Sequence, residues 1–182
     1  MSNCCVIGLG YIGLPTALLI AKSGLKVLGV DINRNIIDTL KSGKIHIVEP
    51  GLSSLLKKVT LTGTFKAGTI PDEADIYVIA VPTPFKEDDS RVPEPDISFV
   101  LNAIKSICPF LKKNNLVILE STSPVGTTEI VEEEIIRNTN FNKGEINIAY
   151  CPERVLPGNV LYELINNDRV IGGLNENSSK LT

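Results

Sequence analysis

The chain has 182 residues, of which 43% are hydrophobic and 21% are charged, and its formal net charge is −3 at pH 7. This length and composition are typical of a globular protein with one sizeable core. The mildly acidic balance argues against nucleic acid or an anionic membrane surface as a partner. The apolar run Ile12–Ala21 is too short to span a bilayer, and no basic segment precedes it, so we expect neither a membrane span nor a signal peptide.

The four cysteines give no sign of a metal site or of a disulfide framework. They stand at positions 4, 5, 108 and 151, without CxxC spacing, and His46 is the chain's single histidine. Zinc sites and disulfide-rich domains need closely spaced pairs of such ligands. We therefore expect reduced, buried thiols, no metal, and a cytoplasmic location.

Short apolar, β-branched segments alternate with segments of helical period along the chain. The expected elements are, in chain order, strand Cys4–Ile7, helix Tyr11–Ser23, strand Lys26–Val30, helix Asn33–Ser42, helix Gly51–Val59, strand Leu61–Ala67, strand Asp75–Val81, helix Ile97–Leu111, strand Leu116–Leu119, helix Thr127–Asn138, strand Ile146–Tyr150, helix Leu161–Ile165 and strand Val170–Ile171. This alternation predicts an α/β fold, doubly wound and Rossmann-type, with a mostly parallel sheet and helices on both faces. We expect one domain over residues 1–182.

One long loop interrupts this alternation. It covers Pro82–Pro95, contains four prolines, and carries the charged run Lys86–Arg91. A loop of this length is either functional or a tolerated surface insertion. For the charged run itself we expect a solvated tip.

The segment VIGLGYIGLP (Val6–Pro15) carries a GxGxxG motif between the first strand and the first helix. Such a motif in this context is typical of a dinucleotide-binding turn. Gly8 would permit the tight turn, Gly10 the close approach of a pyrophosphate, and Gly13 the packing of helix against strand. The first helical N–H groups would then face the phosphates. A glycine-rich turn without a ligand is the alternative, and the acid described next argues against it.

Asp31 follows the second strand and completes the dinucleotide fingerprint. Its carboxylate would accept hydrogen bonds from the ribose hydroxyls of the adenosine and would repel a 2′-phosphate. This predicts NAD rather than NADP. Arg34 complicates the choice, because a nearby arginine can accommodate that phosphate; we interpret Arg34 as solvent-facing or lying over the adenine.

Two further strand ends carry hydroxyl groups. Thr83 lies between two prolines in AVPTP, and LESTSPVGTT includes Ser121, Thr122 and Thr128. Ligands of open α/β sheets bind at the carboxyl ends of the strands, where both segments fall. Ser and Thr also cap helices and stabilise turns without any ligand. The residues alone leave these two interpretations about even.

Five segments, in order along nearly the whole chain, resemble the UDP-sugar 6-dehydrogenases of the UDP-glucose/GDP-mannose dehydrogenase superfamily. They are IHIVEPGL (Ile45–Leu52), AVPTPF (Ala80–Phe85), VILESTSPVGTTE (Val117–Glu129), AYCPERVLPG (Ala149–Gly158) and NDRVIGG (Asn167–Gly173). CPERVLPG is most similar to the UDP-N-acetyl-D-mannosamine enzymes, whereas UDP-glucose enzymes more often have a variant of NPEFLxEG. The second glutamate of that variant is Pro157 here. UDP-N-acetylglucosamine and UDP-glucose remain alternative substrates.

The resemblance implies an NAD-dependent, two-step oxidation of the sugar's C6 alcohol to a uronic acid through a thioester on a cysteine, for surface polysaccharide precursors. It also implies a UDP-sugar substrate and a full-length homodimer. By position, Tyr11, Ile12, Asp31, Thr83 and Thr128 match NAD contacts, Arg154 and Val155 match substrate contacts, and Glu153 and Thr122 match residues that organise the catalytic water and proton transfer. From the residues alone, Glu153 is either a base at the active edge of the sheet or half of a structural Glu–Arg pair.

The resemblance further implies that the nucleophilic cysteine and the catalytic lysine lie beyond the region covered here. Cys151 neighbours Glu153, but it does not occupy the nucleophile's motif, and we interpret it as a packing residue. We therefore expect a fragment without the linking helix and the UDP-binding domain, inactive by itself. A nucleotide-binding or interaction module without chemistry of its own is the alternative from another class.

Overall fold

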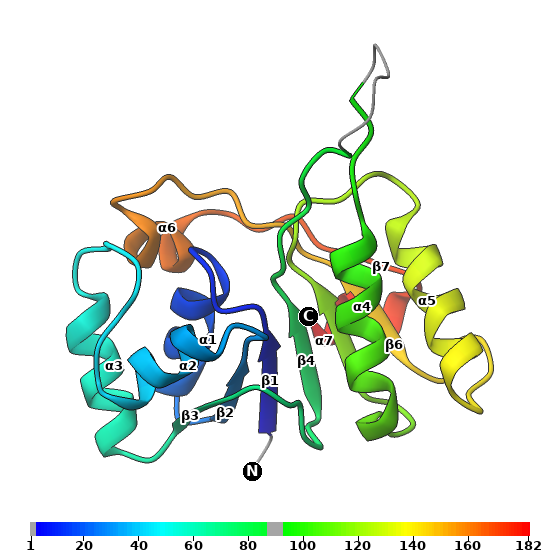
Figure 1. Ribbon diagram of the computed structural model, residues 1–182. Coiled ribbons are helices and arrows are strands. Elements are labelled where there is room, and N and C mark those ends of the chain that lie inside the picture. Colours follow the sequence, from blue (N-terminus) through cyan, green and yellow to red (C-terminus); the bar gives the residue numbers. More distant parts are fainter. Residues whose placement is uncertain (1–2, 87–92) are drawn as a thin grey trace.

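The computed structural model describes residues 3–86 and 93–182 (Figure 1). These residues form one seven-stranded sheet in the order β3-β2-β1-β4-β5-β6-β7, in which β7 alone runs antiparallel to its neighbour. The strands are β1 (Asn3–Ile7), β2 (Lys26–Val30), β3 (Phe65–Gly68), β4 (Ile76–Ile79), β5 (Leu116–Leu119), β6 (Asn147–Tyr150) and β7 (Gly172–Gly173). The helices are α1 (Gly13–Lys22), α2 (Arg34–Lys41), α3 (Leu52–Leu61), α4 (Ser98–Ile107), α5 (Thr127–Asn138), α6 (Val160–Asn166) and α7 (Glu176–Leu181). The predicted fold class is confirmed.

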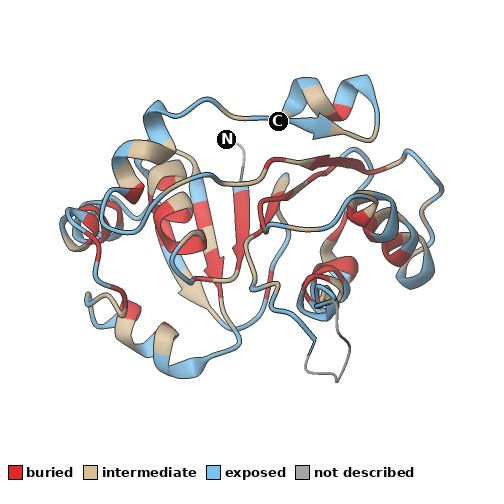
Figure 2. Cartoon of the chain, turned by 90° about the horizontal axis from the view of Figure 1, so that it is seen from above, coloured by how far each residue is buried: buried red, intermediate tan, exposed pale blue. Residues whose placement is uncertain are grey.

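The sheet has a hydrophobic core on each face. In β1, Cys4 and Val6 point into a core shared with α1, α2 and α3, while Cys5 and Ile7 point into a core shared with α4 and α5. Because both faces of the central strands are covered, these strands read as continuous apolar runs. Figure 2 shows the buried residues concentrated in the strands and on the helix surfaces that face them.

The order of the strands places a crevice between β1 and β4. From β1 the chain winds outward through β2 to β3, and it then crosses back to β4 on the other side of β1. The turns that leave the carboxyl ends of β1 and β4 therefore diverge toward opposite halves of the sheet. Ligands of doubly wound folds bind at this kind of switch point.

Two predicted strands were displaced. Leu61 belongs to the end of α3 and is exposed, and the strand begins only at Phe65, after a turn in which Gly63 has φ +68°. The strand expected at Val170–Ile171 is instead the short β7, which pairs with β6 through backbone groups of two glycines. Apolar residues alone predicted the wrong positions. The start of β3 depends on the turn before it, and the position of β7 depends on its pairing with β6.

The helix boundaries agree with the expectations to within two residues, except at the end of α4. Pro109 lacks the backbone N–H that would continue α4, which ends at Ile107, and a 3-10 turn follows. Asn33 caps α2 as predicted, with its side chain accepting a hydrogen bond from the N–H of Asn35. The predicted helix at Tyr11 begins only at Gly13, and α7 was not predicted at all.

The stem of the Pro82–Pro95 loop is a short antiparallel contact between Phe85 and Pro95, with an ion pair of 2.9 Å between Lys86 and Glu94. The charged run expected there lies, apart from Lys86, outside the described residues. In the part of the chain that the structure does describe, no helix is long and apolar enough to cross a membrane.

Glu49 connects two segments that are far apart in the sequence. Its carboxylate is buried and accepts hydrogen bonds from the N–H groups of Gly158 (2.9 Å) and Val160 (2.8 Å), at the start of α6. The bond from Val160 satisfies a donor that the start of a helix leaves unpaired. The segment that follows β6 is therefore fastened across the amino-terminal half of the sheet.

Candidate functional site

Two adjoining cavities lie at the carboxyl ends of β1, β4 and β5. The larger has a volume of about 620 Å³ and is lined by the glycine turn after β1, by the end of β2 and by residues of α4. The smaller has a volume of about 170 Å³ and is lined by Ile12, Ala80, Val81, Thr83, Glu120, Ser121, Thr122 and Glu153. Because Ile12, Ala80 and Val81 line both cavities, the two cavities adjoin, and together they are called the cleft below.

The three glycines of the turn differ in what requires them. A Cβ at Gly8, where φ is +93°, would lie 2.4 Å from the carbonyl oxygen of Ala80, and a Cβ at Gly13 would lie 1.9 Å from the carbonyl oxygen of Gly8. Packing inside the protein therefore demands glycine at both positions. A Cβ at Gly10 would meet no atom within 4 Å, and this residue lines the larger cavity. The open space at Gly10 fits the approach of a pyrophosphate.

Asp31 also lines the larger cavity and holds the turn in place. Its Oδ2 accepts a hydrogen bond from the N–H of Leu9 (2.9 Å), and its Oδ1 accepts one from the N–H of Asn33 (2.8 Å). A carboxylate has about four lone-pair sites, so both oxygens keep capacity for the hydroxyls of a ribose. Arg34 is exposed at the start of α2 and does not belong to the lining of either cavity.

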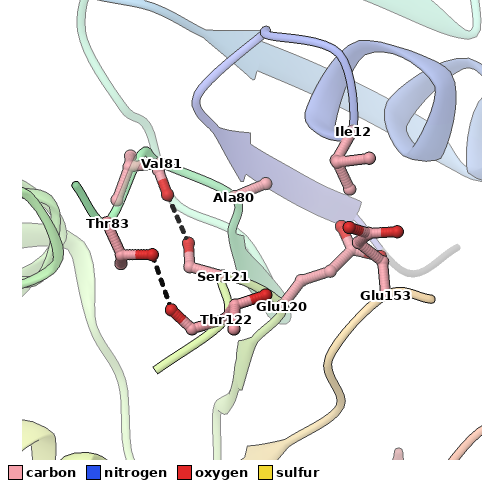
Figure 3. A pocket seen from close by; sticks show the side chains of 8 residues that line it. All are labelled: Ile12, Ala80, Val81, Thr83, Glu120, Ser121, Thr122 and Glu153. Carbon is pink, nitrogen blue, oxygen red and sulfur yellow. Dashed lines mark hydrogen bonds between the residues drawn. The ribbon is translucent and has the colours of Figure 1, made fainter. Parts of the chain in front are cut away.

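Hydroxyl groups lock the two loops around the smaller cavity together (Figure 3). The Thr83 hydroxyl donates to the carbonyl oxygen of Thr122 at 2.6 Å, and the Ser121 hydroxyl donates to that of Val81 at 2.7 Å. These hydroxyls therefore stabilise the two loops, which is one of the two interpretations that the sequence left open. They do so in residues that line a cavity, so contact with a ligand remains compatible with their position. Thr128 lies in the first turn of α5, donates to Glu129, and does not line either cavity.

The segment after β6 brings Glu153 to the smaller cavity. Its Oε2 accepts a hydrogen bond from the N–H of Val155 at 2.8 Å. Among the ion pairs of residues 3–86 and 93–182 there is none between Glu153 and Arg154, so the structural Glu–Arg pair is not what the fold forms. Arg154 is exposed, and neither it nor Val155 lines a cavity.

The structure brings together two charged residues that the sequence analysis did not single out, Glu120 and Arg169. Glu120 directly follows β5 and is only 4% exposed, and its Oε1 lies 3.2 Å from the hydroxyl of Thr16 and 3.5 Å from Nη2 of Arg169. Burial raises the pKa of Glu120 to about 7, against the lowering effect of Arg169 and Thr16. A carboxyl group at the end of the apolar run LVIL was the available signal.

All four thiols are buried and free. Burial raises the pKa of Cys4 and Cys5 to about 12 and that of Cys108 to about 11, and it also raises the pKa of Cys151 despite the nearby Arg169. A thiolate is the nucleophilic form of cysteine. These surroundings therefore give none of the four an activated thiolate, in line with the packing role expected for Cys151.

Comparison with known proteins identifies the family. A sequence model described as the NAD binding domain of the UDP-glucose/GDP-mannose dehydrogenase family matches residues 2–182. The chain belongs to this family. The cofactor of this dehydrogenase domain is NAD, and the space at Gly10 together with the free lone pairs of Asp31 fits it.

Individual relatives point to one subgroup of the UDP-glucose/GDP-mannose dehydrogenase family. The chain is 55% identical to a UDP-N-acetyl-D-mannosamine dehydrogenase from Campylobacter jejuni over 94% of its length, and 55% identical to one from Escherichia coli over 93%. A solved UDP-N-acetyl-mannosamine dehydrogenase from S. aureus superposes with a TM-score of 0.92 at 46% identity, covering 99% of this chain and 43% of that one. The chain spans 44% and 41% of the length of the first two relatives.

Substitution of two glycines by alanine separates packing from cofactor binding. Gly10→Ala should leave the free energy of unfolding close to that of the wild type, because no atom lies near the new Cβ. It should weaken NAD binding by at least tenfold, or about 1.4 kcal/mol, because that Cβ occupies the space for the pyrophosphate. Urea unfolding and calorimetric titration with NAD measure the two effects.

Gly13→Ala is the matched control, since its Cβ meets the backbone of Gly8 rather than open space. Overpacking of this severity should cost about 3 kcal/mol of unfolding free energy or more. Wild-type NAD affinity in Gly10→Ala would contradict the assignment of the pyrophosphate to this turn.

Proposed function

We propose that this chain forms the NAD-binding part of a UDP-N-acetyl-D-mannosamine 6-dehydrogenase, which oxidises the C6 alcohol of its sugar to a carboxylate in two NAD-dependent steps. The observation that carries the proposal is the pair of adjoining cavities, the larger lined by Asp31 and Gly10 and the smaller by Glu153. Relatives that share 55% of the residues are UDP-N-acetyl-D-mannosamine dehydrogenases, which supports this substrate.

The larger cavity suits the adenosine and pyrophosphate of the cofactor. The positive end of the α1 dipole lies next to Gly10, whose carbonyl oxygen accepts a hydrogen bond from the N–H of Leu14 at 3.2 Å. Asp31 accepts from the ribose hydroxyls, Tyr11 lines the larger cavity, and Ile12 lines both cavities. Thr83, Ser121 and Thr128 complete the proposed set of cofactor contacts on the opposite loops, and Arg34 extends it at the exposed start of α2.

The smaller cavity suits the reacting end of the cofactor and of the sugar. NAD, when bound, supplies the acceptor for the hydride. Glu153 and Thr122 line this cavity, and there they hold a water molecule or take up a proton as the alcohol is oxidised. Arg154 and Val155 follow on the segment that Glu49 fastens, and we assign them to the substrate.

We propose that the thiol that forms the thioester is not among the four cysteines of this chain, since all of them are buried and burial raises their pKa values. We propose that residues 1–182 act as one NAD-binding domain. A linking helix and a UDP-binding domain of the whole enzyme would supply the nucleophilic cysteine and the catalytic lysine.

A homodimer, a cytoplasmic location and a role in making surface polysaccharide precursors belong to the same proposal. The free thiols fit a reducing compartment.

The activity is tested by following NADH absorbance with three UDP-sugars. The whole enzyme should oxidise UDP-N-acetyl-D-mannosamine faster than UDP-N-acetylglucosamine or UDP-glucose, and faster oxidation of either competitor would overturn the substrate assignment. The 182 residues alone should bind NAD without sustained NADH production, because they offer no activated thiolate. Sustained turnover by these residues would contradict this division of labour. A whole protein that binds NAD but oxidises none of the three sugars would instead be a binding module.

The preference for NAD over NADP is tested by Asp31→Ala. The substitution should weaken NAD binding by more than tenfold, which corresponds to about 1.4 kcal/mol or more, because it removes the acceptor for the ribose hydroxyls. It should weaken NADP binding less, because the carboxylate no longer repels the 2′-phosphate. Calorimetric titrations measure both, with Asp38→Ala on the exposed side of α2 as the control and circular dichroism as the check on folding. Equal affinities for NAD in the mutant and the wild type would remove Asp31 from the cofactor site.

A further inference from the structure

Glu120 has one carboxyl oxygen that the protein leaves unpaired. Oε1 accepts from the hydroxyl of Thr16 and lies 3.5 Å from Nη2 of Arg169, whereas the buried Oε2 has no hydrogen-bond partner among the described residues. Nη1 of Arg169 is likewise buried and unpaired within that part of the chain. Buried polar atoms in folded proteins are almost always hydrogen-bonded. An acceptor left over at this place indicates that its partner comes from outside the protein.

The position of Glu120 indicates what that partner is. Glu120 lines the smaller cavity, which continues from the larger one past Ile12, Ala80 and Val81. For a dinucleotide with its ribose at Asp31 and its pyrophosphate at Gly10, the smaller cavity is the adjoining space that can take the second nucleoside. This step rests on the proposed function. The second nucleoside of NAD ends in a nicotinamide ring, whose amide N–H groups are donors.

The charges around this cavity favour a cation. Glu120 and Glu153 both line it, and Figure 3 shows the two carboxyl groups directed toward Ile12. The titratable and charged groups that face Glu120 are Arg169 from the segment before β7, Glu153 and Cys151 from the segment after β6, and Cys4 from β1. Arg169 lies 3.5 Å from Glu120, whereas Glu153 has no ion-pair partner among residues 3–86 and 93–182, so the cavity carries one negative charge in excess when both carboxyl groups are ionised. The nicotinamide ring is positively charged in NAD⁺ and neutral in NADH.

We propose that Glu120 is a further cofactor-binding residue, whose buried carboxyl group faces the nicotinamide ring and makes the domain bind the oxidised cofactor in preference to the reduced one. The unpaired Oε2 accepts a hydrogen bond from the amide of either form, and the negative charge adds an attraction that only the oxidised ring feels. In a cavity that excludes water, this attraction is stronger than it would be in solution. Release of NADH after each oxidation step is favoured for the same reason.

The preference depends on pH with a definite sign. Burial raises the pKa of Glu120 to about 7, so the free domain carries this carboxyl partly protonated at neutral pH. The oxidised ring stabilises the ionised form and lowers that pKa, so binding of NAD⁺ releases a proton. Affinity for NAD⁺ therefore rises from pH 6 to pH 8, by up to about tenfold if only the ionised form binds. NADH and ADP-ribose, which carry no ring cation, show no such rise.

Calorimetric titration of the 182-residue chain at pH 6, 7 and 8 tests this with three ligands: NAD⁺, NADH and ADP-ribose. For the wild type we expect a several-fold rise in NAD⁺ affinity over this range and a flat or falling profile for the other two. At pH 7, titration in two buffers of different ionisation enthalpy should show that NAD⁺ displaces a fraction of a proton and that ADP-ribose does not. Glu120→Gln keeps the shape of the side chain and removes its charge. This variant should lose the pH-dependent rise and lower the ratio of NAD⁺ to NADH affinity at pH 8 by at least threefold.

Glu133→Gln, on the exposed face of α5, is the matched control and should behave like the wild type. Equal pH profiles for NAD⁺ and ADP-ribose in the wild type would overturn the role of Glu120, and this comparison decides the question even if Glu120→Gln fails to fold. An unchanged NAD⁺ to NADH ratio in a folded Glu120→Gln would also overturn it. Binding of ADP-ribose in those cases would leave the proposed function standing, whereas failure of all three ligands to bind would refute the proposed function itself.

Discussion

The contact between the glycine turn and the end of β4 is the constraint on which the site depends. Gly8 and Gly13 leave no room for a Cβ, because the backbone of the turn, the start of α1 and the backbone of Ala80 lie in van der Waals contact. This contact brings the amino end of α1 to the switch point of the sheet. It also makes Ala80 and Val81 the shared wall of the two cavities.

Carboxylates that are at least partly buried then give the cleft its chemistry. Asp31 is held by two backbone N–H groups, which fixes its oxygens toward a ribose. Glu49 is held in the same way and fastens the segment that carries Glu153. Glu120 differs from both, since its hydrogen bonds come from side chains and reach only one oxygen. The incompletely paired carboxyl group is therefore the one best placed to respond to a ligand.

The sequence predicted the fold and the nucleotide end of the site well, because local patterns carry that information. The alternating apolar segments predicted six of the seven strands at overlapping positions. Gly8, Gly10, Gly13 and Asp31 form a fingerprint that can be recognised within one βαβ unit. The predicted position of β7 was wrong because this strand depends on long-range pairing: Gly172 and Gly173 form it only by pairing with β6. Glu120 could not be recognised for a related reason. Its partners Thr16 and Arg169 are 104 and 49 residues away, and no sequence pattern shows that all three converge.

The central claim is that one cofactor molecule extends along the whole cleft, and a crystal structure of the chain with NAD⁺ tests it most directly. The account predicts density for the adenosine beside Asp31, for the pyrophosphate over Gly10, and for the nicotinamide within hydrogen-bonding distance of Glu120 in the smaller cavity. A nicotinamide ring directed to solvent, with the smaller cavity filled by water alone, would contradict it.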